Sequence, residues 1–160
     1  MEIVSLDKMP ILPKTKSPKL IEEELTWYDA STYFYQMRDL CHSLNGVGLH
    51  AVQVGLPYDM FVATTNGFSF DFYVSCSYEG IGEKIDSVEG CLSILDENNS
   101  PIHYKVKRFN KIIVSGYRYL RNDELVPIKM EFQGFPAIIM QHEIDHGNNI
   151  LISQIGEKYN

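Results

Sequence analysis

The alternation of hydrophobic and polar positions predicts a helix near each end of the chain. Between residues 28 and 44, apolar side chains recur at the three- and four-residue spacing of an amphipathic helix, and Asn45-Gly46 supplies a stop signal. A second helix is expected to begin with the Gly-Phe-Pro sequence at 134–136, because proline is tolerated in a first helical turn. Gly147 is a plausible C-cap for this helix.

The segments between the two helices are rich in the β-branched and aromatic residues typical of strands. Two strands, DMFVATT and FDFYVSCSY, are predicted around a turn at Asn66-Gly67. Three more follow as HYKVKRF, KIIVSGYRYL and ELVPIKMEF, with a turn at 121–123 between the last two. Residues 1–24 are expected to be irregular, because three prolines interrupt them. The order of helix, strands and helix indicates an α+β domain.

Length and composition narrow the class of protein. A chain of 160 residues with 44% hydrophobic residues is expected to form one globular domain over residues 1–160. A net charge of −7 argues against general affinity for nucleic acid or an anionic membrane surface. The N-terminal segment resembles neither a secretory signal nor a transit peptide, and three cysteines suit free thiols or metal ligation, so the cytoplasm is the expected compartment.

The candidate chemistry lies in the sequence QHEIDHG at 141–147. His142 and His146 are four positions apart and therefore emerge on one face of the second helix, where both imidazoles can reach one cation. Glu143 lies about 100° around the helix from His142, where it can contact a water molecule beside that cation. The alternative is a buried helix that merely contains two histidines. The apolar turn before it weakens that alternative, because burying imidazoles and carboxylates without partners costs several kcal/mol in rough terms.

A catalytic metal usually has three protein ligands, so a third is needed. The candidates elsewhere in the chain are His42, His50, His103 and Cys91. Cys41 lies on the apolar stripe of the first helix and is expected to be a small core residue, as is Cys76. Cys91 stands out among the candidates because Gly90 directly before it lets the backbone approach closely.

Three motifs in order resemble the signature motifs of the peptide deformylases. They are GVGLHAVQVG at 46–55, EGCLS at 89–93 and QHEIDH at 141–146, and the resemblance covers roughly residues 40–155. It implies antiparallel or mixed β-sheets around a central ligand-bearing helix. It also implies a metal-dependent hydrolase that removes the N-formyl group from the N-terminal methionine of nascent polypeptides and releases formate.

The resemblance implies a role for each matching residue. Cys91, His142 and His146 match the metal ligands, which usually hold Fe²⁺ in the cell and accept Ni²⁺, Co²⁺ or Zn²⁺ in vitro. Glu143 matches the catalytic glutamate. The side-chain amide of Gln53 and the backbone N–H of Leu92 match the groups that bind the developing oxyanion. The remaining expected contacts to substrate come from Gly46, Val47, Gly48, Glu89, Gly90, Phe135, Ile138 and Ile139.

Several of these assignments have ordinary structural alternatives. Gly46 can be a helix C-cap, and the three apolar residues of the second helix can be plain core residues. Glu89, Arg108 and Asp145 can form an outer layer that supports the ligands. A solvated surface pair is the alternative for Arg108 and Asp145.

Two departures from the family pattern stand out. His50 occupies a position where the family usually has a small residue. A bulkier side chain beside the substrate groove is the expected consequence, and a fourth metal ligand is the alternative. Only residues 147–160 follow His146, so the chain resembles the short, phage-encoded members that lack a C-terminal extension. The expected partners are formylmethionyl nascent chains, encountered at the ribosome exit, and the expected state is a monomer.

Two rival functions remain open at this point. A zinc endopeptidase of the His-Glu-x-x-His type usually takes a third ligand of His, Glu or Asp, often from downstream, where only Asn148, Asn149 and Glu157 remain. A non-catalytic metal- or peptide-binding relative should have lost Glu143, Gln53 or a ligand, and all are present.

Overall fold

The computed structural model describes residues 1–6, 27–120 and 124–160. The predicted turn at 121–123 and most of the predicted irregular N-terminal segment therefore lie outside the described residues. In chain order the elements are α2 (Trp27–Ser43), β1 (Gly48–His50), the 3₁₀ helix η2 (Ala51–Val54), β2 (Met60–Ala63), β3 (Asp71–Glu89), β4 (Tyr104–Tyr119), β5 (Leu125–Gln133), α3 (Phe135–Gly147), α4 (Ile152–Ile155) and β6 (Glu157–Lys158).

All the described strands belong to one antiparallel sheet. Its order is β1-β2-β3-β4-β5, and the short β6 pairs with one end of β4. Each strand from β1 to β5 pairs with the next one in the sequence, which is the arrangement that short turns favour. The α+β prediction is confirmed.

The predicted boundaries differ from the observed ones at two places. HYKVKRF and KIIVSGYRYL form one continuous strand, β4, because its whole length pairs with β3. Gly147 is the last residue of α3 and not its C-cap, so that prediction was wrong. The C-cap is Asn148, whose backbone N–H donates to the carbonyl of Asp145, while the N–H of Asn149 donates to the carbonyl of His146.

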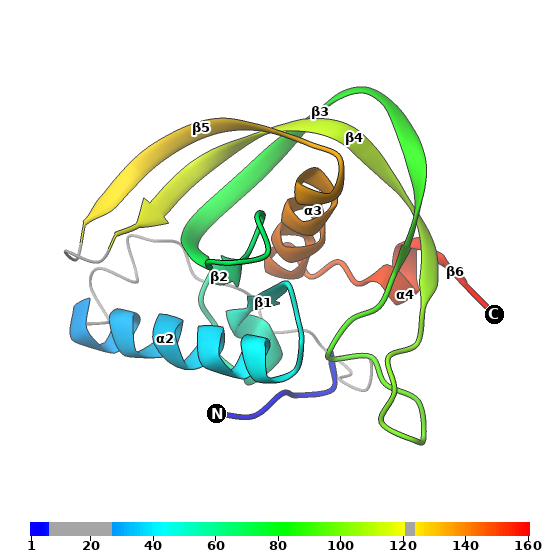
Figure 1. The fold of residues 1–160 in the computed structure, drawn as a ribbon, viewed down its shortest axis with the longest axis horizontal. Helices are drawn as coiled ribbons and strands as arrows, with labels where there is room; N and C mark the ends of the chain where they lie inside the picture. Colours follow the sequence, from blue (N-terminus) through cyan, green and yellow to red (C-terminus); the bar gives the residue numbers. More distant parts are fainter. Residues whose placement is uncertain (7–26, 121–123) are drawn as a thin grey trace.

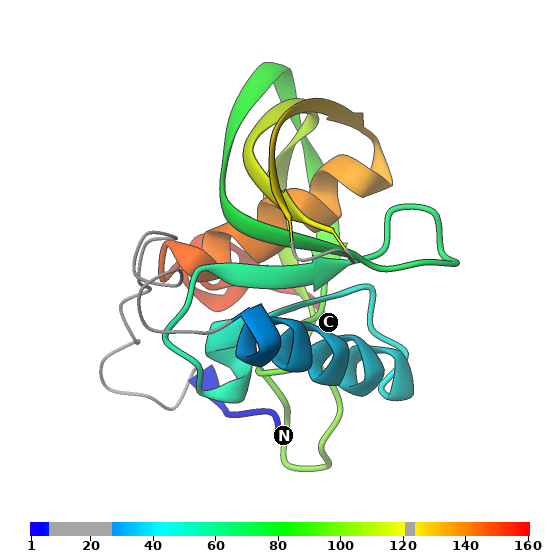
Figure 2. The same ribbon diagram turned by 90° about the vertical axis from the view of Figure 1, so that its left-hand side faces the viewer.

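The long strands curve around α3, which lies on their concave side (Figure 1). The pairing of β3 with β4 shifts register between Ile81 and Lys84, and Gly82 in this interval has a left-handed φ of +76°, which a glycine adopts readily in a β-bulge. Such a bulge bends the strands and increases their twist. α2 lies below β1 and β2, away from the arch (Figure 2).

The helix α3 is buried on several sides, because it contacts β1, β2, β3, β4 and β5. Its apolar residues Ile139, Met140 and Ile144 pack with Phe61 and Tyr73 of the sheet. Gln141, Glu143, Asp145 and His146 of the same helix are buried as well. Buried polar groups need hydrogen-bond or metal partners, so these residues indicate a functional site on this helix.

No helix within the described parts of the chain is long and apolar enough to cross a membrane.

Candidate metal centre and pocket

The helix α3 and the segment after β3 bring three candidate ligands together. His142 and His146 are one helical turn apart, with ring centroids separated by 4.9 Å. Cys91 lies opposite them, and its Sγ is 3.6 Å from Nε2 of His146. One ligand atom from each of the three residues lies within 4.8 Å of the others. The other histidine candidates, His42, His50 and His103, are not part of this cluster.

Cys91 reaches this position because β3 ends just before it, at Glu89. A tight turn follows, in which the N–H of Ile94 donates to the Cys91 carbonyl at 3.2 Å. A Cβ on Gly90 would lie 3.2 Å from Cβ of Pro101 and 3.3 Å from Nε2 of His103, so the backbone passes close to the neighbouring segment. A glycine suits this close approach, as the sequence suggested.

A buried ionic network lies behind the ligands. Nδ1 of His142 is 2.9 Å from Oε1 of Glu89, which leaves its Nε2 to face the cluster. Arg108 donates to both carboxylate oxygens of Glu89, at 2.9 Å each, and to Asp145. Arg108 is only 2% exposed, so the alternative of a solvated surface pair with Asp145 was wrong. The network instead supports the ligand helix from behind.

This network stabilises the ionised form of Glu89. Burial works against ionisation, but hydrogen bonds from His142 and Arg108 outweigh it and lower the pKa of Glu89 to about 2. The resulting carboxylate is the usual partner of a histidine that binds a metal through its other nitrogen.

Glu143 is a buried carboxyl beside the cluster. It is 4% exposed, and its Oε2 has no hydrogen-bond partner among the described residues. Burial raises the pKa of Glu143 to about 7. A Cβ on Gly48 would lie 2.7 Å from Oε1 of Glu143, so a glycine there gives the carboxyl its space. A group of this kind can exchange a proton near neutral pH.

Gln53 directs its amide toward the thiol. Its Oε1 accepts the backbone N–H of His50 at 2.9 Å. Its Nε2 donates to Oγ of Ser93 at 3.1 Å and to Sγ of Cys91 at 3.4 Å. Ser93 had not been predicted as a site residue, although its place in EGCLS, two residues after the cysteine, is a usable signal.

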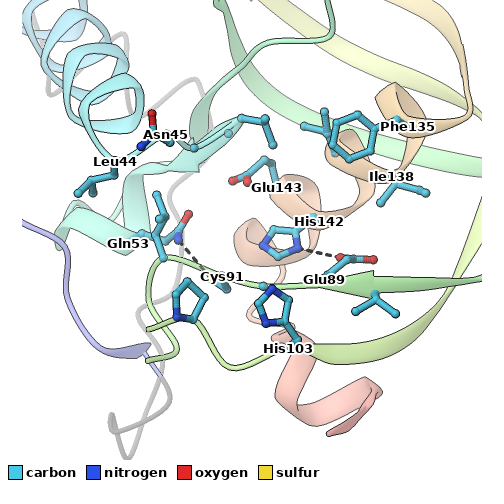
Figure 3. Close-up of a pocket in the computed structure, with 18 residues that line it drawn as sticks. Leu44, Asn45, Gln53, Glu89, Cys91, His103, Phe135, Ile138, His142 and Glu143 are labelled. Carbon is cyan, nitrogen blue, oxygen red and sulfur yellow. Dashed lines mark hydrogen bonds and ion pairs between the residues drawn. The ribbon is translucent and has the colours of Figure 1, made fainter. Parts of the chain in front are cut away.

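Gln53, Cys91, His142 and Glu143 line one pocket, which has a volume of about 320 Å³ (Figure 3). Every residue predicted to contact substrate lines it: Gly46, Val47, Gly48, Glu89, Gly90, Phe135, Ile138 and Ile139. Ile139 belongs to the hydrophobic core as well, so for this residue the pocket and core alternatives both hold. The sequence had given no reason to expect Leu44, Asn45, Val88 or Pro101 at the pocket, since no local pattern marks them. His103, considered as a third ligand, lines the pocket but does not join the cluster.

His50 does not lie beside the pocket, so the expected bulk next to the groove was wrong. Its side chain is fully buried and is absent from the pocket lining. Cys41 and Cys76 are buried core residues, as predicted.

The cluster fits a transition metal. One thiol and two imidazoles are the donor set that zinc, iron, nickel or cobalt accepts, whereas Mg²⁺ and Ca²⁺ prefer oxygen. Nε2 of His146 faces Cys91, and its buried Nδ1 has no hydrogen-bond partner among the described residues. A cation held between the three side chains would bind the thiol and Nε2 of His146, whereas Nδ1 lies on the other side of the ring and would not be a ligand.

The fold and the site together define a class of protein. An antiparallel sheet curves around a helix that carries two histidines of a candidate Cys-His-His metal centre. A family model described as polypeptide deformylase matches residues 2–158, and the chain belongs to that family.

Curated relatives agree with this family assignment. The chain is 32% identical to the peptide deformylase of Karelsulcia muelleri over 133 residues, which are 80% of this chain and 66% of the relative. It is 34% identical to that of Aquifex aeolicus over 116 residues, 69% of this chain and 63% of the relative. These matches span slightly less than two thirds of each relative's length.

Solved structures share the fold. A probable peptide deformylase from Synechococcus phage S-SSM7 superposes with a TM-score of 0.78 at 25% identity, covering 97% of this chain and 99% of the other. The Synechococcus elongatus peptide deformylase, solved in complex with actinonin, gives a TM-score of 0.79 at 25% identity, covering 99% of this chain and 79% of that one.

Proposed function

We propose that this protein is a metal-dependent deformylase that hydrolyses the N-formyl group of formylmethionyl peptides. The observation that carries the proposal is the convergence of three kinds of group on one pocket: the Cys91, His142 and His146 cluster, the carboxyl of Glu143, and the amide of Gln53. Acyl transfer to water needs all three kinds, because an amide resists attack by neutral water.

A transition metal held by the three ligands would supply Lewis acidity, which polarises a carbonyl and lowers the pKa of water. Glu143 accepts the proton of the attacking water and delivers it to the leaving nitrogen. The formyl C–N bond breaks, formate leaves, and the peptide keeps a free amine. A pKa of about 7 suits both directions of proton transfer.

Gln53 and the backbone N–H of Leu92 are the proposed donors to the oxyanion. Nε2 of Gln53 is already directed at the Cys91 thiol, and both residues line the pocket. Removing one such donor from an acyl-transfer site typically lowers the rate by about 10² to 10³.

Apolar side chains along α3 suit a methionine side chain. Ile138, Ile139 and the 62% exposed Phe135 line the pocket one to two turns before the ligands. Across from them, Gly46, Val47 and Gly48 offer backbone groups at the edge strand β1, to which an extended peptide can pair.

Ferrous iron is the proposed native metal, with nickel, cobalt or zinc as substitutes, on the resemblance and on the thiol-containing donor set. Metal analysis of protein purified without oxygen tests this choice. The cytoplasmic location, the monomeric state and the encounter with nascent chains at the ribosome remain predictions. Sedimentation of the purified protein checks the monomeric state, and its co-sedimentation with ribosomes checks the encounter.

The decisive experiment measures formate release from formyl-Met-Ala-Ser by nickel-loaded protein and by Glu143→Ala. The wild type should turn over, whereas Glu143→Ala should keep its metal and lose activity by at least about 10²-fold. Glu131→Ala, which removes an exposed glutamate on β5, is the matched control and should leave turnover unchanged. Cleavage of internal bonds in unformylated peptides would favour the endopeptidase alternative.

The Synechococcus elongatus relative binds actinonin. We therefore expect actinonin to inhibit formate release here in competition with the peptide. A metal-loaded wild type that neither releases formate nor binds actinonin would support a non-catalytic relative instead.

A further inference from the structure

His50 lies at the junction of β1 and η2 and is fully buried, away from the pocket. It makes three polar contacts. Its backbone N–H donates to Oε1 of Gln53 at 2.9 Å. Its Nδ1 accepts the backbone N–H of Val52 at 3.2 Å, and its Nε2 is 3.2 Å from Oδ1 of Asp59. One residue therefore contacts η2 twice and also reaches the loop before β2.

The contacts indicate the tautomer of the imidazole ring. A nitrogen that accepts a hydrogen bond carries no proton, so Nδ1 is bare and the ring proton lies on Nε2. That proton points to the carboxylate of Asp59. The ring is therefore held from both sides, as the N-cap of η2 on one side and by Asp59 on the other.

The backbone contact decides which way the Gln53 amide faces. An amide has an acceptor end and a donor end, and the backbone N–H of His50 occupies the acceptor end. This contact does not depend on the side chain, so the His50 ring acts on the amide only by holding η2 in place. The donor end must then turn away, toward Oγ of Ser93 and Sγ of Cys91. Reversing the amide would set its NH₂ group against the His50 N–H, two donors facing each other.

The same histidine ties this arrangement to the ligand helix. A Cβ added to Gly147 would lie 3.0 Å from Nε2 of His50 and 2.6 Å from Oδ1 of Asp59. The end of α3 therefore packs directly against the His50–Asp59 pair, one residue after His146. The rings of His50 and His146 are 6.4 Å apart, and the ring of Phe61 stacks on His50 at 6.0 Å.

We propose that His50, held by Asp59, is a positioning residue that aligns the Gln53 amide with the Cys91, His142 and His146 cluster. It acts by capping η2, which carries Gln53, and by bracing η2 against the end of α3. Its effect on catalysis passes through Gln53 and requires no contact with substrate. This inference rests on the proposed deformylase function.

A double-mutant cycle with His50→Ala and Gln53→Ala tests the inference. Formate release is measured over a range of substrate concentrations and expressed per bound metal ion. His50→Ala alone should lower kcat by about 10-fold to 100-fold with KM within about twofold, because a small misplacement of a catalytic group costs that much. In the Gln53→Ala background, adding His50→Ala should change kcat by less than about twofold, because residues that act through one another are not additive.

A second pair of variants covers the case in which His50→Ala does not fold. The side chain of Asp59 is 23% exposed, whereas that of His50 is fully buried. We therefore expect a substitution of Asp59 to disturb the packing less than one of His50. Asp59→Ala should lower kcat at least about threefold without raising KM, and the loss should vanish in the Gln53→Ala background. Asp59→Asn keeps an acceptor for the Nε2 proton and should restore most of the turnover. His42→Ala, which removes an exposed histidine of α2, is the control for loss of an imidazole.

A spectroscopic measurement on the zinc-loaded protein, which is diamagnetic, gives a readout independent of turnover. The side-chain NH₂ signals of Gln53 are identified by their absence from the spectrum of Gln53→Ala. Their chemical shifts should move toward those of a solvated amide in His50→Ala and in Asp59→Ala. The same chemical shifts should be unchanged in His42→Ala. Unchanged Gln53 signals in His50→Ala would overturn the inference.

Additive losses in the double-mutant cycle would also overturn it. A wild type without deformylase activity is a different outcome, because it refutes the proposed function and leaves the NMR comparison to decide the position of Gln53. Wild-type turnover with additive variants refutes the positioning role alone.

Discussion

Oε1 of Glu89 lies 2.9 Å from Nδ1 of His142, and the same carboxylate accepts two hydrogen bonds from Arg108. The carboxylate thus fixes the tautomer of a candidate ligand while an arginine on β4 fixes the carboxylate. Partners of this kind commonly set metal affinity although they never touch the metal.

Glu89→Gln should weaken metal binding by about 10-fold to 100-fold, because the amide is a poorer acceptor for the His142 proton. Competition against a chromophoric chelator measures the affinity. Asp86→Asn is the matched control, since Asp86 lies on the same strand and pairs with the exposed Lys105 and Lys107. Equal affinity in wild type and Glu89→Gln would show that the carboxylate does not support the ligand.

Arg108→Met should destabilise the fold by about 3–5 kcal/mol, because Glu89 and Asp145 would be left buried without their cation. The free energy of unfolding in urea measures this. Arg118→Met removes a partly exposed pair with Asp71 and should cost about 1 kcal/mol or less. Similar losses in the two variants would contradict the importance assigned to burial.

Gly48→Ala should impair catalysis while the metal stays bound. The added Cβ would lie 2.7 Å from Oε1 of Glu143, so the carboxyl must move. We expect kcat to fall by about 10-fold or more, as misplacement of a catalytic group does. Gly67→Ala, whose Cβ would meet no atom within 4 Å, should leave turnover intact despite strain from its φ of +78°. Full activity in Gly48→Ala would show that the carboxyl of Glu143 does not depend on the space that Gly48 leaves.

Stability should decline at alkaline pH through Cys76. Burial raises the pKa of this thiol to about 12, whereas an unfolded cysteine titrates near about 8.5. The folded pKa is the higher one, so the contribution to stability is complete below about pH 8.5 and is lost as the pH rises toward 12. Between pH 9 and 11 the wild type should lose about 1.4 kcal/mol more per pH unit than Cys76→Ala. Parallel pH profiles of the two proteins would contradict this.

Local periodicity was enough for much of the fold and for the ligand helix. The pattern over residues 28–44 predicted α2 within one residue at each end, because a helix needs only the spacing of its own apolar side chains. The four-residue spacing of His142 and His146 likewise fixed their common face before any packing was known. The turn predicted at Asn66-Gly67 likewise indicated that the two strands beside it pair, as β2 and β3 do.

The pattern failed where distant segments meet. Two predicted strands became one in β4, since pairing with β3 on both sides of Asn110 outweighs the local break there. Arg108 was open to interpretation as a surface charge, and only the burial of Glu89 and Asp145 beside it makes it an internal cation.

The sequence alone therefore determined the residue types of the site and the two histidines on one helix, because helix geometry is local. Only the tertiary structure decided that Cys91 faces those histidines, and that Arg108 pairs with the buried carboxylates of Glu89 and Asp145. It also decided that His50 contacts Gln53 and lies away from the groove. The direction of a side chain depends on which segments pack around it.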